Sequence, residues 1–185
     1  MINNKSLIVN LPTIISIIIF SFSCGKDEIP KSTLVLKDNL LYKQGSDVPF
    51  TGRERALVEN KIIEYDVKDG LKHGEFRIFS ENGVLEIQGQ IDSNRNVGKW
   101  QYFYPNGQIE SEGNFVNDLP EGLWLWKYPD GKKKEEGIFT KGKRTGVWNF
   151  YDDAGNMTLE KNYDIEDTLQ VDADDSKFLD KKLQP

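Results

Sequence analysis

Aromatic and polar side chains alternate along several segments of the chain. In Trp-Gln-Tyr-Phe-Tyr at 100–104 and in Trp-Leu-Trp-Lys-Tyr at 124–128, the first, third and fifth residues are aromatic. Alternate side chains of a β-strand point to the same face of its sheet. Each segment therefore predicts a strand that carries a row of rings on one face.

Glycine recurs along the chain with a period of 24 residues, and a large aromatic residue stands two positions after each glycine of the first series. The first series is Gly74, Gly98, Gly122 and Gly146; the second is Gly83, Gly107, Gly131 and Gly155; the third is Gly89, Gly113 and Gly137; the aromatic residues are Phe76, Trp100, Trp124 and Trp148. The third series lapses at Lys161. A fixed period of this length is typical of a repeat protein, in which each unit packs against its neighbours.

Each unit is predicted to be a β-hairpin. Turn-forming residues follow the first strand, as in Pro-Asn-Gly at 105–107, where the glycine suits the left-handed φ of a type I turn with a G1 bulge. A second turn is expected where units join, because residues that accept positive φ stand four positions before each first-series glycine. These are Gly70, Asn94, Asp118 and Gly142. The expected fold is all-β: hairpins that form one elongated, twisted antiparallel meander.

The chain divides into an N-terminal leader, a repeat region and a tail. Residues 1–23 are the leader, 24–32 a tether, and 33–51 a cap hairpin with strands at 34–36 and 40–42. The repeats span 52–163, as a degenerate unit 52–73 with strands near 55–58 and 62–67, then 74–97, 98–121, 122–145 and 146–163. The tail, 164–185, is acidic and is expected to be disordered.

The repeat units carry a family resemblance. Gly-Lys-Trp-Gln-Tyr-Phe-Tyr-Pro-Asn-Gly at 98–107 and Gly-Leu-Trp at 122–124 resemble the bacterial variant of the MORN repeat, and the lead-in segment 42–52 is similar to that of such proteins. Proteins made of this repeat are often classed as antitoxin components of the YwqK type. The resemblance covers about 40–163 and implies a MORN-like β-hairpin fold, whereas such repeats occur in proteins of many roles.

The first 23 residues predict a lipoprotein signal peptide. Residues 7–22 are almost wholly apolar but short for a spanning helix, and Pro12 interrupts them. They lead into Ser-Phe-Ser-Cys-Gly at 21–25, which resembles the lipidation site of bacterial lipoproteins. We expect acylated Cys24 to hold the protein in a lipid bilayer, since two or more acyl chains anchor a protein stably. Ordinary signal cleavage that leaves a free thiol is the alternative.

The segment after the cysteine bears on location. Gly-Lys-Asp-Glu at 25–28 is similar to the short acidic segment that some Bacteroidota lipoproteins use for transfer to the cell surface. A solvated, charged tether is the simpler interpretation. The expected location is the cell envelope, anchored to the outer membrane at its periplasmic face or at the cell surface.

Composition excludes several classes of partner and site. The 185 residues carry a formal net charge of −6, which argues against nucleic acid or anionic lipid as the main partner. One cysteine and one histidine exclude an internal disulfide and a Cys/His zinc cluster. We expect no cofactor and no bound metal. Basic residues concentrate in two groups, at 132–134 and 141–144, which lie a strand length apart and are expected to be solvated edge charges.

We expect no enzymatic activity and no catalytic residues. His73, the only side chain that titrates near neutral pH without help, lies in a predicted connection between units. Glu135 and Glu136 are adjacent in a strand, so they point to opposite faces and cannot act together on one bond.

The aromatic residues of successive units form a predicted aromatic ladder: Trp100, Trp124 and Trp148 with Tyr102, Trp126 and Phe150 alongside. Such rings could stack on sugars or grip a peptide, but a single-layer sheet must bury something, and each ring removes roughly 150–250 Å² from water. We therefore expect the ladder to be the core. The third-series glycines should lie under rings from a paired strand, because glycine inside a strand marks a close approach. Tyr104 and Tyr128, near the turns, and Trp126 are the candidate contact surface.

The expected function is non-catalytic presentation of a β-repeat surface to a protein partner at the cell envelope. Two alternatives stay open. One is a glycan or cell-wall binding module that uses the aromatic ladder, and the other is an antitoxin or immunity-type protein that neutralises a toxin. The residues do not identify the partner.

Overall fold

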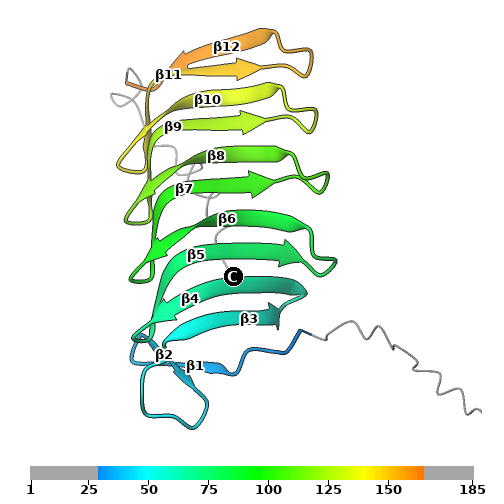
Figure 1. The fold of residues 1–185 in the computed structure, drawn as a ribbon. Helices are drawn as coiled ribbons and strands as arrows, with labels where there is room; N and C mark the ends of the chain where they lie inside the picture. Colours follow the sequence, from blue (N-terminus) through cyan, green and yellow to red (C-terminus); the bar gives the residue numbers. More distant parts are fainter. Residues whose placement is uncertain (1–28, 165–185) are drawn as a thin grey trace, which may run out of the picture.

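In the computed structural model, residues 29–164 are described, and they form twelve β-strands with no helix among them (Figure 1). Ten strands, β3 to β12, make one antiparallel sheet in which each strand pairs with its neighbours in the chain. Figure 1 shows them stacked in chain order as an elongated sheet. This arrangement confirms the predicted all-β meander of hairpins.

The strands follow the predicted hairpins closely. They are β1 (Leu34–Lys37), β2 (Leu40–Lys43), β3 (Gly52–Val58), β4 (Lys61–Lys68), β5 (Leu71–Ser80), β6 (Leu85–Asp92), β7 (Arg95–Phe103), β8 (Ile109–Val116), β9 (Leu119–Lys127), β10 (Lys133–Thr140), β11 (Lys143–Tyr151) and β12 (Met157–Asn162). The degenerate unit supplies β3 and β4, and each later unit supplies one hairpin. β1 and β2 form a separate two-stranded sheet where the cap hairpin was expected.

Two kinds of turn alternate along the sheet. Units are joined by two-residue turns in which both residues have positive φ, as at Asn117 (50°) and Asp118 (69°), the geometry of a type I′ turn. At the hairpin tips the backbone N–H of the second-series glycine donates to the carbonyl three residues before it, as from Gly107 to Tyr104 at 2.8 Å. The strand register shifts beside that tip, between Tyr102 and Phe103. The predicted turn with a bulge is therefore present.

In the units 98–121, 122–145 and 146–163, the tryptophan packs onto a glycine of the preceding unit. A Cβ atom at Gly89 would lie 2.2 Å from the Trp100 ring, and one at Gly113 would lie 2.2 Å from the Trp124 ring. The same relation joins Gly137 to the ring of the following unit. The expected cover of the third-series glycines is confirmed.

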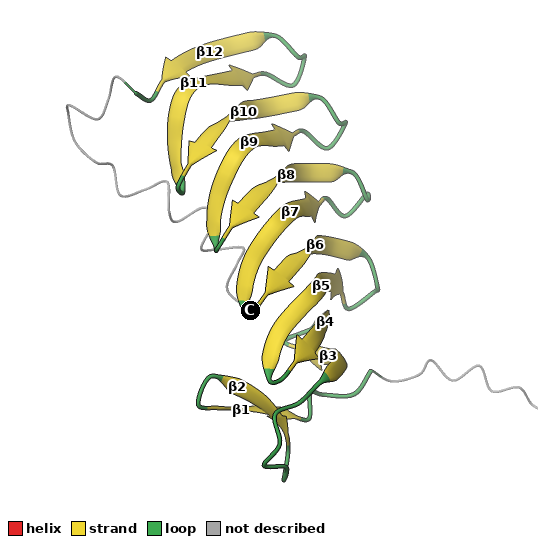
Figure 2. Ribbon diagram, turned by 60° about the vertical axis from the view of Figure 1, so that its left-hand side comes forward, coloured by secondary structure: helices red, strands yellow, loops and turns green. Residues whose placement is uncertain are grey.

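Bends lie opposite these glycines. The register between neighbouring units shifts at each glycine, and the extra residues belong to the facing strand: Glu112 and Asn114 of β8 pair with Leu125 and Glu121 of β9. A bulged strand bends, and this bulge contains Gly122 with a φ of 76°. Figure 2 shows the resulting curvature of β5, β7, β9 and β11.

The core lies on one face of the sheet, which we call the tryptophan face. Trp100 is 2% exposed, and Trp124 and Trp148 are 0% exposed. Each indole N–H donates to a backbone carbonyl of the preceding strand, as from Trp124 to Asn114 at 3.2 Å. Phe115 and Phe139 fill the spaces between the indoles in edge-on contacts. The ladder is therefore the core of a single-layer sheet, as predicted.

The two ends of the array depart from the regular unit. At the last unit Tyr163 packs edge-on against Trp148, and Arg144 stacks 4.0 Å from the Trp148 ring. No further tryptophan follows in the chain to cover position 161, so Lys161 can replace the strand glycine there. At the first end the cap attaches through backbone hydrogen bonds, including Leu41 N–H to the Gly70 carbonyl at 2.8 Å.

Candidate functional site

The three candidate contact residues have structural partners. Trp126 is 8% exposed, and its ring lies 5.5 Å from Trp124 and 5.8 Å from Trp148, measured between centroids. It is a core residue, because the tryptophan of the next unit closes over it. The expectation that Trp126 offers a contact surface was wrong for this reason.

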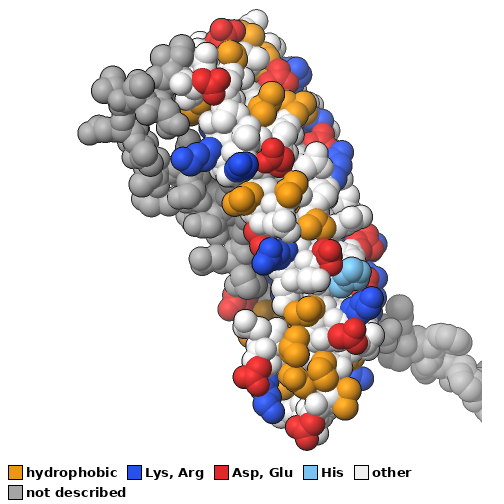
Figure 3. All heavy atoms as spheres, turned by 90° about the vertical axis from the view of Figure 1, so that its left-hand side faces the viewer, with side chains coloured by type: hydrophobic (Ala, Val, Ile, Leu, Met, Phe, Trp, Pro, Cys, Tyr) orange, Lys and Arg blue, Asp and Glu red, His pale blue; other side chains and the backbone are white. Residues whose placement is uncertain are grey.

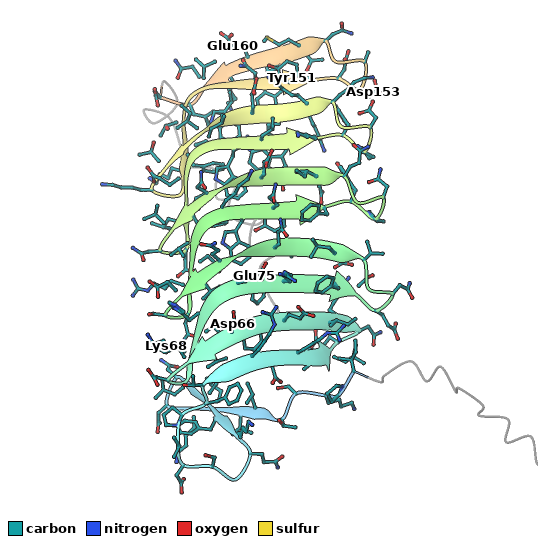
Figure 4. All side chains as sticks on the ribbon, in the orientation of Figure 1. Asp66, Lys68, Glu75, Tyr151, Asp153 and Glu160 are labelled. Atoms are coloured by element: carbon teal, nitrogen blue, oxygen red, sulfur yellow. The ribbon has the colours of Figure 1, made fainter. Side chains whose placement is uncertain are left out.

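Tyr104 and Tyr128 act as struts between units. The Tyr104 hydroxyl donates to the carbonyl of Lys127 at 2.7 Å, and the Tyr128 hydroxyl donates to that of Tyr151 at 2.8 Å. Both side chains are half-buried, and burial is the main reason that the pKa of Tyr104 is raised. Their rings are partly accessible, but their hydroxyl groups are already hydrogen-bonded to backbone carbonyls of the sheet. Other tip residues also link units, as when Lys132 donates to the carbonyl of Asp153 at 2.7 Å. Figure 4 labels Asp153 at the hairpin tip of the last unit.

The strut is missing from the unit 74–97. Ser80 stands 24 residues before Tyr104, at the same position in its unit. Its hydroxyl accepts a hydrogen bond from the Val84 N–H at 3.1 Å, within its own turn. Serine is too short to reach the next unit, so nothing at this position takes the place of a tyrosine ring.

A cavity of about 650 Å³ lies at this break, on the hairpin-tip side of β4, β5, β6 and β7. We call it the tip pocket. Its apolar floor is formed by four side chains in one cross-strand row, Ile63, Ile78, Ile87 and Tyr102. Farther along the array this row carries Trp126 and Phe150. The pocket exists because Ile78 and Ser80 occupy positions that the next two units fill with rings, Tyr102 and Trp126 for the first and Tyr104 and Tyr128 for the second.

The rim of the tip pocket is acidic. Glu59, Glu86 and Glu110 line it, together with one cation, Lys61. Lys61 Nζ lies 2.5 Å and 2.7 Å from the two carboxylate oxygens of Glu86. The lining therefore holds three carboxylates and one ammonium group over an apolar floor. Burial also raises the pKa of Tyr102 above its ordinary value.

The tip pocket is not among the features that the sequence predicts. The available signal was the mismatch between units: Ser80 where the next two units have Tyr104 and Tyr128, and Ile78 where the next unit has Tyr102. A missing ring can leave a void or be compensated by a neighbouring strand. Only the packing of several strands decides between these outcomes.

The opposite face of the sheet carries a row of hydrogen-bonded polar side chains. Gln88 Nε2 donates to Gln101 Oε1 at 2.6 Å, and Gln101 Nε2 donates to Glu112 at 2.9 Å. Lys99 lies 2.8 Å from the same carboxylate, and its hydrogen bond is the main cause of the lowered pKa of Glu112. This row ties three strands together side by side, and we assign it a structural role.

The basic groups of the unit 122–145 do not form one patch. Lys133 pairs with Glu136 at 3.0 Å on one face of the sheet, whereas Arg144 reaches Glu135 at 2.5 Å on the other face. Figure 3 shows acidic and basic side chains interspersed over the side where units are joined. The surface there has mixed charge, which agrees with solvated edge residues.

The residues considered for catalysis are held in separate pairs. His73 Nδ1 lies 3.1 Å from Asp92, and both side chains are exposed. Glu135 stands opposite Trp126 on the tryptophan face, and Glu136 stands opposite Leu125 on the other face.

Within residues 29–164 no three His, Cys, Asp or Glu side chains gather closely enough to hold a metal ion. That part of the chain also contains no helix able to cross a bilayer. Cys24 lies outside the described residues.

Comparison with known proteins supports the repeat assignment. No curated protein matches the sequence. Among solved structures, the chain is similar to the Glycosylation Associate Protein (Gap123) complex from Streptococcus agalactiae, with 15% identity and a TM-score of 0.37, over 78% of this chain and 29% of that chain. The chain thus spans less than a third of that structure's length. Residues 72–92, 96–117 and 120–141 match the MORN repeat variant. These segments coincide with the hairpins β5–β6, β7–β8 and β9–β10, so three consecutive hairpins of this chain match the MORN repeat variant.

Proposed function

We propose that this protein is a non-catalytic interaction module that binds a protein partner at the tip pocket. MORN repeats are generally modules for interaction with proteins or membranes. The observation that carries the proposal is the pocket of about 650 Å³, with its apolar floor and charged rim, in a sheet whose later units are filled by rings. Its volume lies within the range of specific binding sites, about 300–1,000 Å³.

The surrounding sheet suits a rigid binding surface. The floor residues Ile63 and Tyr102 are 9% and 3% exposed, and they belong to strands paired on both sides. Such strands hold a pocket in one shape, so little binding free energy is lost in ordering the pocket when a partner binds. The titratable groups at the rim are carboxylates and a lysine arranged around a void, an arrangement that serves recognition better than bond cleavage.

The proposal includes a lipid anchor at Cys24 that keeps the module at the cell envelope, on the outer membrane. Its support is the apolar leader and the sequence around the cysteine. Replacement Cys24→Ala should abolish fatty-acid labelling and release the protein from membranes. Persistent labelling of the variant would rule out this attachment point.

A site-specific photocrosslinker tests the pocket as the binding site. Asn82 lines the pocket, and Ala154 occupies the same turn position three units later. A benzophenone side chain at 82 should give one discrete crosslinked protein in intact cells, and the same group at 154 should not. Identical patterns from both positions, or none from position 82, would contradict the proposal.

The two alternative functions make different demands on the structure. Glycan stacking on the aromatic ladder needs exposed rings, and the three ladder tryptophans at 100, 124 and 148 are at most 2% exposed. An immunity-type role is a special case of partner binding. It requires that the crosslinked partner kills cells that lack this protein.

A further inference from the structure

We infer that the tip pocket receives a tyrosine side chain from a basic segment of the partner protein, and that this ring replaces the strut that the unit 74–97 lacks. The inference rests on the proposed function, because it names the chemistry of the partner at the same site. It follows from the repeat geometry and from the charge of the rim.

The repeat geometry defines what the pocket lacks. Tyr104 and Tyr128 each donate a hydrogen bond to the carbonyl 23 residues later, at Lys127 and Tyr151. The equivalent carbonyl for Ser80 belongs to Phe103, and both residues line the tip pocket. A phenol that enters the pocket can therefore reproduce a contact that the sheet makes twice elsewhere. Its ring would cover the isoleucines of the floor.

The charge of the rim selects the neighbours of that tyrosine. Glu59, Glu86 and Glu110 outnumber Lys61, and Lys61 is already paired with Glu86. Lysine or arginine beside the incoming ring would meet carboxylates, and such complementarity favours encounter and register. Acidic segments are repelled, and these include residues 164–185 of this chain, which hold seven acidic and three basic residues. A second copy of the chain, with its own net charge of −6, fits less well than a basic partner.

A labelled five-residue peptide with tyrosine at its centre and lysine at both ends is the probe. Fluorescence anisotropy against the full-length protein should show saturable binding that weakens as salt is raised. A phenylalanine peptide should bind about tenfold more weakly, since it forfeits one hydrogen bond. An alanine peptide should not bind. Equal affinity for the tyrosine and alanine peptides would overturn the inference.

Two variants test the site of binding. Ser80→Tyr supplies the missing ring from the chain itself, and it should weaken peptide binding more than tenfold, whereas Asp152→Tyr, at the same unit position in the last unit, should leave it unchanged. Glu59→Lys changes an exposed turn residue and should weaken binding several-fold, with Glu160→Lys on β12 as its control. Circular dichroism checks that each variant is folded. Unchanged affinity in both Ser80→Tyr and Glu59→Lys would refute the site.

The outcomes separate this inference from the proposed function. If the benzophenone at position 82 captures a partner but the tyrosine peptide does not bind, the partner chemistry is wrong and the pocket stands as an interaction site. If neither occurs, both fail. If free tyramine binds as tightly as the peptide, the pocket recognises a small phenol, and the inference of a protein segment is overturned.

Discussion

Replacing Gly113 with alanine tests the interlock of glycine and tryptophan on which the sheet depends. The added Cβ would lie 2.2 Å from two atoms of the Trp124 ring and 2.5 Å from a third. The ring cannot simply tilt away, because it is 0% exposed and is held between Phe115 and Phe139 at centroid distances of 5.2 Å and 5.9 Å. The strands must therefore separate, or the indole must leave its position.

The magnitude follows from three effects. Overpacking a filled core costs about 1–3 kcal/mol. Displacing the indole also strains its hydrogen bond to the Asn114 carbonyl, now 3.2 Å, which contributes about 1 kcal/mol. Replacing glycine with alanine in a strand also stabilises the folded state by about 0.5–1 kcal/mol, because the unfolded chain then has less conformational entropy to lose. We expect Gly113→Ala to lower the free energy of unfolding by about 1–3.5 kcal/mol.

Urea denaturation followed by tryptophan fluorescence measures this change. Asn114→Ala is the matched control, because its exposed side chain lies next in sequence on the opposite face, and it should change the free energy by less than about 0.5 kcal/mol. The double variant Gly113→Ala with Trp124→Ala should cost less than the two single changes combined, since the alanine then meets no ring. Equal stability of Gly113→Ala and the wild-type protein would show that the ring does not need the glycine.

Three further outcomes are expected. Trp124→Ala should lower the free energy of unfolding by roughly 3–5 kcal/mol, because the ring is core; a loss under about 1 kcal/mol, together with lost partner binding, would make it a contact residue instead. Tyr128→Phe removes the hydrogen bond to the Tyr151 carbonyl and should cost about 0.5–1.5 kcal/mol in the same denaturation experiment, whereas an unchanged midpoint would show that the strut carries no stability. Burial, and after it the charge of Glu54, raises the pKa of Tyr65 to about 12 from its ordinary 10.0. The folded state then keeps a proton that the unfolded state releases, so this contribution to stability is present below pH 10 and falls as the pH rises from about 10 to 12. Tyr65→Phe should flatten that part of the stability curve, and a slope as steep as in the wild-type protein would refute the assignment.

The tip pocket is a feature that the sequence did not predict. Ser80 stands at the unit position that Tyr104 and Tyr128 occupy in the next two units, yet this difference alone does not define a cavity. The space depends on how far the Ile63, Ile78 and Ile87 side chains reach and on how the neighbouring strands pack around them. Trp126 illustrates the converse, because it was named as a contact residue and the Trp148 ring of the next unit lies 5.8 Å from it.

The sequence by itself determined the period, the hairpins, both kinds of turn and the identity of the core rings. These features are local: a turn needs a residue that accepts positive φ, and alternation within one strand decides which side chains share a face. Only the tertiary structure decided that the Trp124 ring lies on Gly113, in the preceding unit, although the strand register places Trp124 opposite Gly137 of its own hairpin. It also placed the cap in a separate sheet and left the tip pocket open. Ring direction and unfilled volume arise from several strands packed together, and no single segment of the chain encodes them.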